Sequence, residues 1–458
     1  MTLIKSISGI RGTIGGKQGD NLTPIDIVKY ASAFGSWAKS QNPSAKIVIG
    51  RDARVSGKMV SELIANTLTG LGIDVVDLGL STTPTVEIAV PKEGAVGGII
   101  VTASHNPGQW NALKLLNEYG EFLDQHAGQK VIDIANSESI EFEDVSKLGS
   151  ITEANQYINQ HVTDILDLNL VDSEAIKQKG FRVAIDCVNS TGGLALPKLL
   201  KALGASYVEE LYCDPTGIFP HNPEPLPENI THICEVMKKG SFDVGFIVDP
   251  DVDRLAIVDE NGIFIGEEYS LVLIADYVLS KTPGPVVSNM SSSSALNVIA
   301  EKHGHKRTEA AVGEVNVVNE MKKVGAIIGG EGNGGIIYPD LHYGRDALVG
   351  IGLFLSYLAM SGNTVSQLMA AAPKTFIAKN KIELSPEVDT SNIIENLTKE
   401  FSEYPINTMD GLKIYFEDGW AQIRRSNTEP IIRVYTEGQT KDRAAEIFEL
   451  ISQKTNLS

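Results

Sequence analysis

An apolar, strand-like run that ends in a polar loop occurs three times along the chain. Residues 46–49, 182–185 and 285–287 are rich in Val, Ile or Ala, and each run precedes a polar loop and a helix-like segment. Each unit continues with a second arrangement of strand, loop and strand, centred on Ser104, residues 249–253 and Glu331. The irregular spacing argues against a solenoid and predicts three divergent but similar α/β domains.

The last part of the chain has a different pattern. Helix-like stretches near 392–401 and 441–453 are combined with short strand-like runs separated by turns. These runs are residues 375–378, 412–416, 420–423 and 431–435. The pattern predicts a smaller α+β domain with an antiparallel sheet. The predicted domains are residues 1–150, 151–252, 253–370 and 371–458.

An acidic loop follows the apolar run at residues 244–248. In an extended loop alternate side chains point the same way, so Asp249, Asp251 and Asp253 can converge on one cation. An all-oxygen site without Cys or His favours Mg²⁺ over zinc. Arg254 adds a positive, fork-shaped group suited to phosphate oxygens.

Three other interpretations of this acidic loop stay open at the level of sequence. An EF-hand would have Glu260 at its twelfth position, but Arg254 stands where the sharp turn needs Gly. An aspartyl-phosphate enzyme would use Asp249 as the nucleophile, which leaves Ser104 without a role. A solvated acidic turn is the commonest fate of such a cluster.

Ser104 lies in a polar loop after the apolar run at residues 97–101 and is a candidate hydroxyl nucleophile. A serine before Asn-Pro is also a frequent turn or capping residue, and an isolated histidine such as His105 is commonly a scaffold group. A serine combined with a hard-cation site, however, is what phosphoryl transfer requires.

Together these motifs resemble those of the α-D-phosphohexomutase family over essentially the whole chain. The resemblance implies that Ser104 carries a phosphoryl group and that Mg²⁺ is held by Asp249, Asp251, Asp253 and the serine phosphate. It further implies that Lys114 is the general acid/base, with a lowered pKa, although Ala112 stands where the family usually has Gly. The implied fold places the four domains around a central cleft.

Further loops resemble the family's substrate-binding segments. The implied substrate contacts are Arg11 near the N-terminus, Glu331 and Asn333 in a Gly-rich loop, Arg345, and Arg424, Ser426, Asn427, Thr428 and Arg433 near the C-terminus. His105 and Arg254 are expected beside the reacting group. The Glu331 loop departs from the common Glu-x-Ser-Gly-His form and is similar to archaeal-type enzymes with Asn-Gly-Gly. That departure leaves the identity of the sugar open.

The resemblance implies interconversion of hexose 6-phosphates and 1-phosphates through a hexose 1,6-bisphosphate, which also serves as activator. Residues 312–314 and the Arg345-Asp346 pair are closer to the phosphoglucosamine mutase and archaeal branches, so glucosamine 6-phosphate is the expected substrate. A phosphoglucomutase/phosphomannomutase is the alternative. A non-catalytic sugar-phosphate sensor is the alternative from another class, and the intact serine, lysine and carboxylates argue against it.

Composition sets limits on partners and location. The chain has 458 residues, of which 42% are apolar, enough for several cores. The net charge of −19 disfavours nucleic acid and anionic membranes as partners. Three cysteines without metal spacing and no signal-like apolar start predict a cytoplasmic protein, and a homodimer is compatible with the pattern. Basic residues in polar loops must attract the phosphosugar: Arg11, Arg51, Arg54, Lys114, Arg254, Arg345, Arg424 and Arg433.

Overall fold

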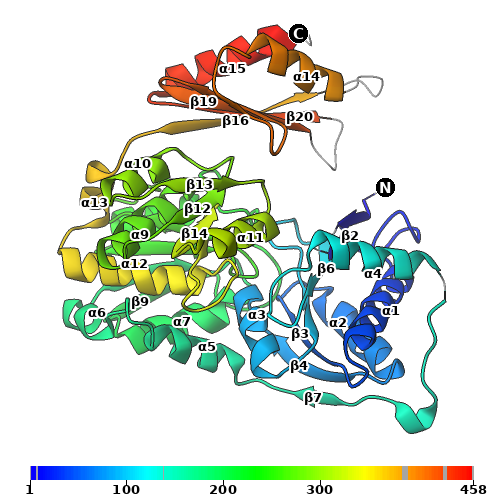
Figure 1. Ribbon diagram of the computed structural model, residues 1–458. Coiled ribbons are helices and arrows are strands. Elements are labelled where there is room, and N and C mark those ends of the chain that lie inside the picture. The colour runs from blue at the N-terminus through cyan, green and yellow to red at the C-terminus, as the bar shows by residue number, and fades with distance from the viewer. Residues whose placement is uncertain (1, 7–8, 138, 384–389, 426–430, 456–458) are drawn as a thin grey trace.

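The computed structural model describes residues 2–6, 9–137, 139–383, 390–425 and 431–455, which form four sheets (Figure 1). The first sheet has the strand order β1-β2-β6-β5-β3-β4-β7. Its strands are β1 (Ile4–Ser6), β2 (Gly9–Thr13), β3 (Lys46–Arg51), β4 (Asp74–Leu80), β5 (Gly97–Val101), β6 (Trp110–Leu116) and β7 (Ile151–Glu153). Its helices are α1 (Pro24–Gln41), α2 (Gly57–Gly70), α3 (Thr83–Lys92) and α4 (Gln125–Ser137).

The apolar runs of this domain become strands that are covered on both faces. Ile47, Val48 and Ile49 of β3 are all completely buried. Their side chains alternate between two separate cores, one on each face of the sheet. A continuous apolar run without polar alternation is the usual pattern of such a central, parallel strand.

The second sheet has the order β11-β10-β8-β9. Its strands are β8 (Arg182–Asp186), β9 (Tyr207–Leu211), β10 (Val244–Val248) and β11 (Leu255–Val258), with helices α5 (Tyr157–Leu166), α6 (Ser173–Lys179), α7 (Gly192–Leu203) and α8 (Thr231–Lys239). β10 and β11 pair antiparallel, with Val248 opposite Leu255. The domain boundary predicted at residue 252 therefore falls between two paired strands of one sheet, because the acidic loop is the turn that joins them.

The third sheet has the order β13-β12-β14-β15. Its strands are β12 (Val286–Asn289), β13 (Arg307–Ala310), β14 (Ile328–Glu331) and β15 (Gly335–Ile337). Its helices are α9 (Glu267–Lys281), α10 (Ala295–Lys302), α11 (Glu314–Val324), α12 (Ala347–Ser361) and α13 (Val365–Ala371). Among the described residues no single helix is long and apolar enough to span a membrane, and the one pair that qualifies together, α12 with α13, is bent by 85°.

The three α/β sheets contain the same four-strand unit, which confirms the prediction of three similar domains. The units are β6-β5-β3-β4, β11-β10-β8-β9 and β15-β14-β12-β13. In each unit the first two strands form an antiparallel hairpin and the remaining neighbours are parallel. In each hairpin a predicted functional loop follows the strand that comes earlier in the chain, which is β5, β10 or β14. These loops contain Ser104, residues 249–253 and the residues after Glu331. The predicted functional loops thus occupy equivalent positions.

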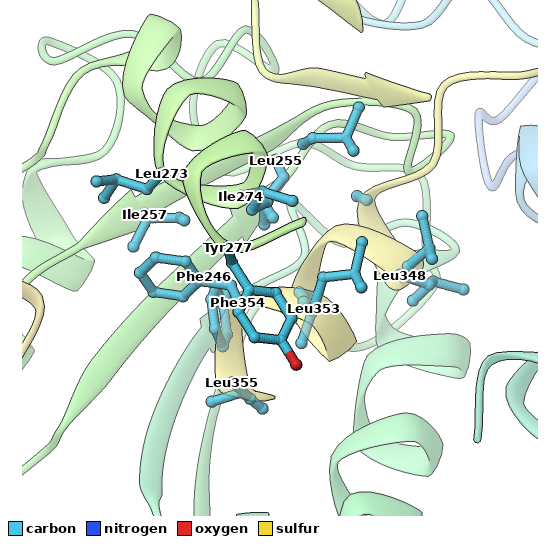
Figure 2. Close-up of a cluster of buried hydrophobic side chains, with 14 of the residues drawn as sticks. Phe246, Leu255, Ile257, Leu273, Ile274, Tyr277, Leu348, Leu353, Phe354 and Leu355 are labelled. Atoms are coloured by element: carbon cyan, nitrogen blue, oxygen red, sulfur yellow. The ribbon is translucent and has the colours of Figure 1, made fainter. Parts of the chain in front are cut away.

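One continuous core joins the second and third domains. Figure 2 shows Phe246 and Ile257 of the second sheet packed with Tyr277 of α9 and with Leu353 and Phe354 of α12. The rings of Phe246 and Phe354 meet edge to face, with centroids 6.2 Å apart. Because this shared core is apolar and close-packed, it fixes the acidic loop relative to the third domain.

The C-terminal domain is an antiparallel sheet with two helices, as predicted. Its strand order is β16-β20-β19-β18-β17, and Figure 1 shows both helices on the side of the sheet away from the other domains. The strands are β16 (Phe376–Glu383), β17 (Ile406–Asn407), β18 (Leu412–Phe416), β19 (Gly419–Arg425) and β20 (Ile431–Gly438), and the helices are α14 (Thr390–Glu400) and α15 (Lys441–Thr455).

Buried polar groups attach the C-terminal domain to the third domain. Glu437 is 1% exposed and accepts hydrogen bonds from the Ser293 hydroxyl at 2.7 Å and the Ser294 amide at 3.0 Å. Lys413 donates to the Met290 carbonyl at 2.6 Å and to Glu309 at 2.7 Å. The contact consists of hydrogen bonds between buried polar groups and not of apolar packing. A buried polar group is costly unless it is hydrogen-bonded, so the contact depends on the hydrogen-bond geometry of each pair.

Candidate active site

The side chain of Ser104 points at the acidic loop. Its Oγ donates a 2.6 Å hydrogen bond to Asp249 Oδ2, and the residue is only 7% exposed. Its φ of 49° lies in the left-handed region, which is uncommon for a residue other than glycine. Such backbone strain persists only where surrounding contacts hold it, and it is frequent at functional sites. The structure thus brings together the predicted serine and carboxylate, which are 145 residues apart.

Arg54 holds the Ser104 loop in place. Its guanidinium donates to the backbone carbonyls of Ser104, Asn106 at 2.7 Å and Pro107 at 2.8 Å. The same guanidinium pairs with Asp52 through Nε at 2.8 Å, and Arg54 is 1% exposed. The sequence shows Arg54 only as one of several loop arginines. Its partners are backbone atoms about fifty residues away, so no motif identifies this role.

The three aspartates of the acidic loop are completely buried and converge. One oxygen from each of Asp249, Asp251 and Asp253 lies within 4.8 Å of the others. Within the described part of the chain, Oδ1 of Asp251 and Oδ1 of Asp253 have no hydrogen-bond partner. Burial, together with the charges of Asp253 and Asp251, raises the pKa of Asp249. The two buried oxygens without a partner leave room for a cation ligand, and this all-oxygen donor set fits Mg²⁺.

The structure excludes two of the three other interpretations of the acidic loop, the EF-hand and the solvated turn. Its flanks are strands β10 and β11, whereas an EF-hand has helices there. Its aspartates are buried, which excludes a solvated turn. Val252, between two of the aspartates, is itself buried and has a φ of 65°, so its side chain and its strained backbone help to shape the loop.

Lys114 of β6 forms ion pairs with two of the aspartates. Its Nζ lies 2.7 Å from Asp251 Oδ2 and 3.2 Å from Asp253 Oδ2. Burial lowers the pKa of Lys114, but Asp251 and Asp253 outweigh burial and raise this pKa above the ordinary lysine value. The predicted lowering of the Lys114 pKa is therefore wrong in this arrangement, because the nearest charges are carboxylates and not cations.

Two arginines and a histidine lie beside this cluster. Arg254 reaches Glu224 at 3.3 Å through Nη1, while its buried Nε has no hydrogen-bond partner among the described residues. Burial and the nearby charge of Arg254 lower the pKa of Arg11. Burial, followed by the charge of Arg254, lowers the pKa of His105 well below its ordinary value. His105 is therefore neutral, and the two arginines form a positive border suited to a phosphate.

Arg345 connects the acidic loop to the predicted sugar loop. Its Nη2 donates to Asp253 at 2.7 Å, its Nη1 to Glu331 at 3.1 Å and its Nε to Glu314 at 2.8 Å. Glu331 also accepts from Asn289 Nδ2 at 2.8 Å. The guanidinium therefore holds three protein carboxylates at once, and its contact with substrate stays a prediction.

The loop after Glu331 is shaped by close backbone contacts. Asn333 Oδ1 accepts from the Gly335 amide at 3.2 Å. Gly334 has a φ of 85°, and its carbonyl accepts from the Leu255 amide at 2.9 Å. A Cβ on Gly334 would lie 2.5 Å from the Leu255 carbonyl oxygen, so only glycine fits there. This contact holds the loop of the third domain against strand β11 of the second domain.

The predicted phosphate-binding segment of the C-terminal domain is described in part. Arg424 and Arg433 are directly opposite each other on β19 and β20. The Arg424 Nε is buried and lacks a hydrogen-bond partner in the described ranges. Ser426, Asn427 and Thr428 lie outside the described residues. The two arginines place positive charge at the edge where that predicted segment begins and ends.

Comparison with known proteins agrees with this arrangement along the chain. Four family profiles match in order: phosphoglucomutase/phosphomannomutase alpha/beta/alpha domains I, II and III at residues 3–141, 155–262 and 267–376, and the C-terminal domain at residues 381–454. The chain belongs to the α-D-phosphohexomutase family. Phosphohexomutases are isomerases that act as intramolecular phosphotransferases, so the protein is an enzyme of this kind.

Individual relatives cover nearly all of this phosphohexomutase. A phosphoglucomutase/phosphomannomutase of Thermococcus kodakarensis is 36% identical over 446 residues, 96% of each chain. A probable phosphoglucosamine mutase of Methanopyrus kandleri is 31% identical over 96% of this chain and 95% of its own. A crystal structure of a family protein from Burkholderia thailandensis superposes with a TM-score of 0.84 at 27% identity, covering 98% of this chain and 97% of its own.

Two further side chains of this phosphohexomutase bear on the acidic loop and were not identified from sequence. Thr83, the first residue of α3, donates through its hydroxyl to Asp251 Oδ2 at 2.6 Å. Glu314, the first residue of α11, orients Arg345. Both lie at helix starts that belong to domains other than that of the acidic loop, so local sequence gives no signal for either contact.

Proposed function

We propose that this enzyme interconverts hexose 6-phosphates and hexose 1-phosphates through a phosphorylated Ser104 and a 1,6-bisphosphate intermediate. The observation that carries the proposal is the 2.6 Å contact between Ser104 Oγ and Asp249, in a buried group of three carboxylates. A hydroxyl nucleophile held against a hard-cation site has the parts that phosphoryl transfer needs, namely positioning and charge neutralisation.

In the first half-reaction the P–Oγ bond of phosphorylated Ser104 breaks and a P–O bond forms to the free hydroxyl of the sugar phosphate. As the P–Oγ bond breaks, Lys114 delivers a proton from Nζ to Ser104 Oγ, and the neutral Lys114 amine then accepts the proton of the attacking substrate hydroxyl. The second half-reaction reverses these transfers with the other phosphate. When Asp249, Asp251, Asp253 and a phosphate oxygen on Ser104 hold Mg²⁺, the ion neutralises charge on the transferring group.

The remaining groups bind and orient the substrate. Arg11 and Arg254 border the reacting phosphate, with neutral His105 beside it. Glu331 and Asn333 contact sugar hydroxyls, since a carboxylate that already accepts protein hydrogen bonds still has unused lone pairs. Arg345 acts as a positioning residue that keeps Asp253 and Glu331 at a fixed separation.

A phosphate clamp in the C-terminal domain completes the proposed site. It consists of Arg424, Ser426, Asn427, Thr428 and Arg433. Because the bisphosphate must bind in two orientations, the clamp has to accept either phosphate while the other one reacts.

We propose glucosamine 6-phosphate as the preferred substrate, supported by relatives named probable phosphoglucosamine mutase in Methanopyrus kandleri and Pyrococcus horikoshii, at 31% and 32% identity. The 36% identical Thermococcus kodakarensis relative favours a second candidate, phosphoglucomutase/phosphomannomutase activity. A cytoplasmic location and activation by hexose 1,6-bisphosphate belong to the same proposal.

A coupled assay with glucosamine 6-phosphate, glucose 1-phosphate and mannose 1-phosphate tests this choice. The largest kcat/KM is expected for glucosamine 6-phosphate. A larger value for glucose or mannose phosphate would transfer the assignment to the second candidate. Absence of turnover with all three, in protein that still binds them, would identify a sugar-phosphate sensor.

A further inference from the structure

A second cluster of ionisable side chains lies where the three α/β domains meet, and the proposed reaction does not use it. Glu87 comes from α3 of the first domain, and His161 comes from α5 of the second. His342 and Asp346 come from the third domain, immediately before α12. His161 and Asp346 are completely buried, and the His342 side chain is 11% exposed.

Both histidines direct the same ring nitrogen at one carboxylate oxygen. His161 Nε2 lies 2.8 Å from Asp346 Oδ2, and His342 Nε2 lies 3.3 Å from it. The two rings are perpendicular, with an interplanar angle of 89°, so they approach this oxygen from different directions. One ligand atom from each of the three residues lies within 4.8 Å of the others. Neighbouring ligands of a tetrahedral ion with bonds of about 2.0–2.2 Å lie about 3.3–3.6 Å apart, so the His342–Asp346 distance already matches and the 2.8 Å His161–Asp346 hydrogen bond has to lengthen when the ion binds.

Two of the three side chains, His161 and Asp346, make a second hydrogen bond, and the third, His342, has a carboxylate near its other ring nitrogen without a hydrogen bond to it. His161 Nδ1 lies 3.0 Å from Thr85 Oγ1, and His342 Nδ1 lies 3.4 Å from Glu87 Oε2. Asp346 uses Oδ1 to accept the Leu348 amide at 2.8 Å, which caps α12 and leaves Oδ2 facing the histidines. An oxygen group behind the Nδ1 atom of a metal-binding histidine fixes both its tautomer and its orientation.

Glu87 supplies an independent indication that the cluster has a ligand. It is 1% exposed, and neither of its carboxylate oxygens has a hydrogen-bond partner in the described part of the chain. A Cβ on Gly344 would lie 1.9 Å from Glu87 Oε2, so this glycine leaves the space that the carboxylate occupies. A buried carboxylate is costly without a compensating positive charge. A cation held by the adjacent histidines would provide that charge.

We propose that Nε2 of His161, Nε2 of His342 and Oδ2 of Asp346 bind a transition-metal ion of the Zn²⁺ type, with Glu87 accepting the Nδ1 proton of His342. Imidazole nitrogens select such ions over Mg²⁺, which prefers oxygen ligands and the separate acidic loop. A surface pocket of about 370 Å³ includes Glu87 and His342 in its lining and provides a route of entry. The bound ion joins all three α/β domains.

Cobalt titration of the full-length protein tests the site directly, because Co²⁺ replaces Zn²⁺ and absorbs visible light strongly when it is four- or five-coordinate, unlike free hydrated Co²⁺. The protein is stripped with a chelator and then held in excess Mg²⁺ to saturate the acidic loop. One equivalent of Co²⁺ per chain is expected to bind and to give this absorption, which Zn²⁺ then abolishes by displacement. No absorption in the wild-type protein would overturn the proposal.

Variants locate the ion. His342→Ala is expected to lose the absorption, while His126→Ala, at an exposed histidine, and Asp251→Asn, in the acidic loop, keep it. Glu87→Gln is expected to bind Co²⁺ about 10–100-fold more weakly, the usual cost of removing such a supporting group. Retained absorption in His342→Ala, or its loss in Asp251→Asn, would place the ion elsewhere and overturn the assignment.

Folding of the variants is checked by circular dichroism. If His342→Ala does not fold, the melting temperature of the wild-type protein is used instead to test whether the site binds Zn²⁺. Zn²⁺ added in excess Mg²⁺ is expected to raise it and the chelator to reverse the rise, and an unchanged melting temperature would overturn the proposal.

Discussion

Arg345 Nη2 lies 2.7 Å from Asp253 Oδ2, and this one ion pair fastens the third domain to the acidic loop of the second. The other side of the same guanidinium holds Glu331 and Glu314. Burial lowers the pKa of Arg345, but these carboxylates outweigh burial and raise it well above the ordinary arginine value. Arg345 is thus a fixed positive charge on which the spacing of the cation site and the sugar loop depends.

Replacing Arg345 tests this dependence. Arg345→Ala leaves buried carboxylates without their partner, so the free energy of unfolding is expected to fall by about 3–5 kcal/mol, measured by urea denaturation. Arg443→Ala is the control, since its ion pairs are at the surface and such pairs contribute little. Equal stability of the two variants would contradict the positioning role.

The proposed nucleophile predicts a stable covalent modification. The purified protein is expected to contain phosphoserine at residue 104, detected by mass spectrometry, and Ser104→Ala is expected to lose it together with nearly all turnover. An acyl phosphate is labile to hydroxylamine, whereas a serine phosphate is not. Phosphate on Asp249 in place of Ser104 would support the aspartyl-phosphate interpretation instead.

Metal removal is expected to abolish turnover. Chelation should stop the reaction, Mg²⁺ should restore it, and Asp251→Asn should need more Mg²⁺ because a charged ligand is lost. Asp133→Asn, at an exposed position, is the control and should respond like the wild type. Full activity of chelated protein would contradict the role of the acidic loop.

The C-terminal clamp is expected to act on binding more than on chemistry. Arg424→Ala should weaken substrate binding by about 1.5–3 kcal/mol, the range for hydrogen bonds to charged groups, while Ser104 stays phosphorylated. More bisphosphate should also escape, so added hexose 1,6-bisphosphate should partly restore the rate. Arg425→Ala, on the same strand but exposed, is the control. Unchanged binding and no extra release in Arg424→Ala would remove it from the site.

The stability of the protein is expected to depend on pH through Glu268. Burial raises the pKa of Glu268 to about 8 in the folded protein, above its ordinary value of 4.5. The folded state therefore keeps a proton that the unfolded state releases, and stability falls as pH rises from about 5 to about 8. Glu268→Gln removes this contribution and should give a flatter profile in urea denaturation at several pH values. An unchanged slope would show that other groups control it.

Local pattern was sufficient to predict the strands and the loops that follow them. Apolar runs such as residues 244–248 form strands that are buried on both faces. Because polar side chains are costly to bury, the polar residues after each run mark the end of the strand and the position of the loop. Ser104 was expected beside the three aspartates because phosphoryl transfer needs a nucleophile next to a hard-cation site and because both motifs resemble those of the family.

Effects that arise between domains could not be predicted from the sequence. The pKa of Lys114 is set by aspartates 137 and 139 residues away, and nothing near Lys114 in the chain shows their charge. Arg54 acts on backbone carbonyls, which every residue has, so its contacts leave no sequence signal. The boundary predicted at residue 252 lies in the turn of the β10–β11 hairpin, because the polar composition of such a turn resembles that of a loop between domains.

The three α/β domains have equivalent hairpins, but the loop that each hairpin carries is different. In the proposed reaction one copy of this repeated unit supplies the nucleophile, the next supplies the cation ligands and the third supplies the sugar loop. The three copies share one strand order, but the proposed reaction assigns a different reagent to each. An excised copy, however stable by itself, is therefore expected to be chemically inert, because the proposed reaction needs all three copies together with the phosphate clamp of the C-terminal domain.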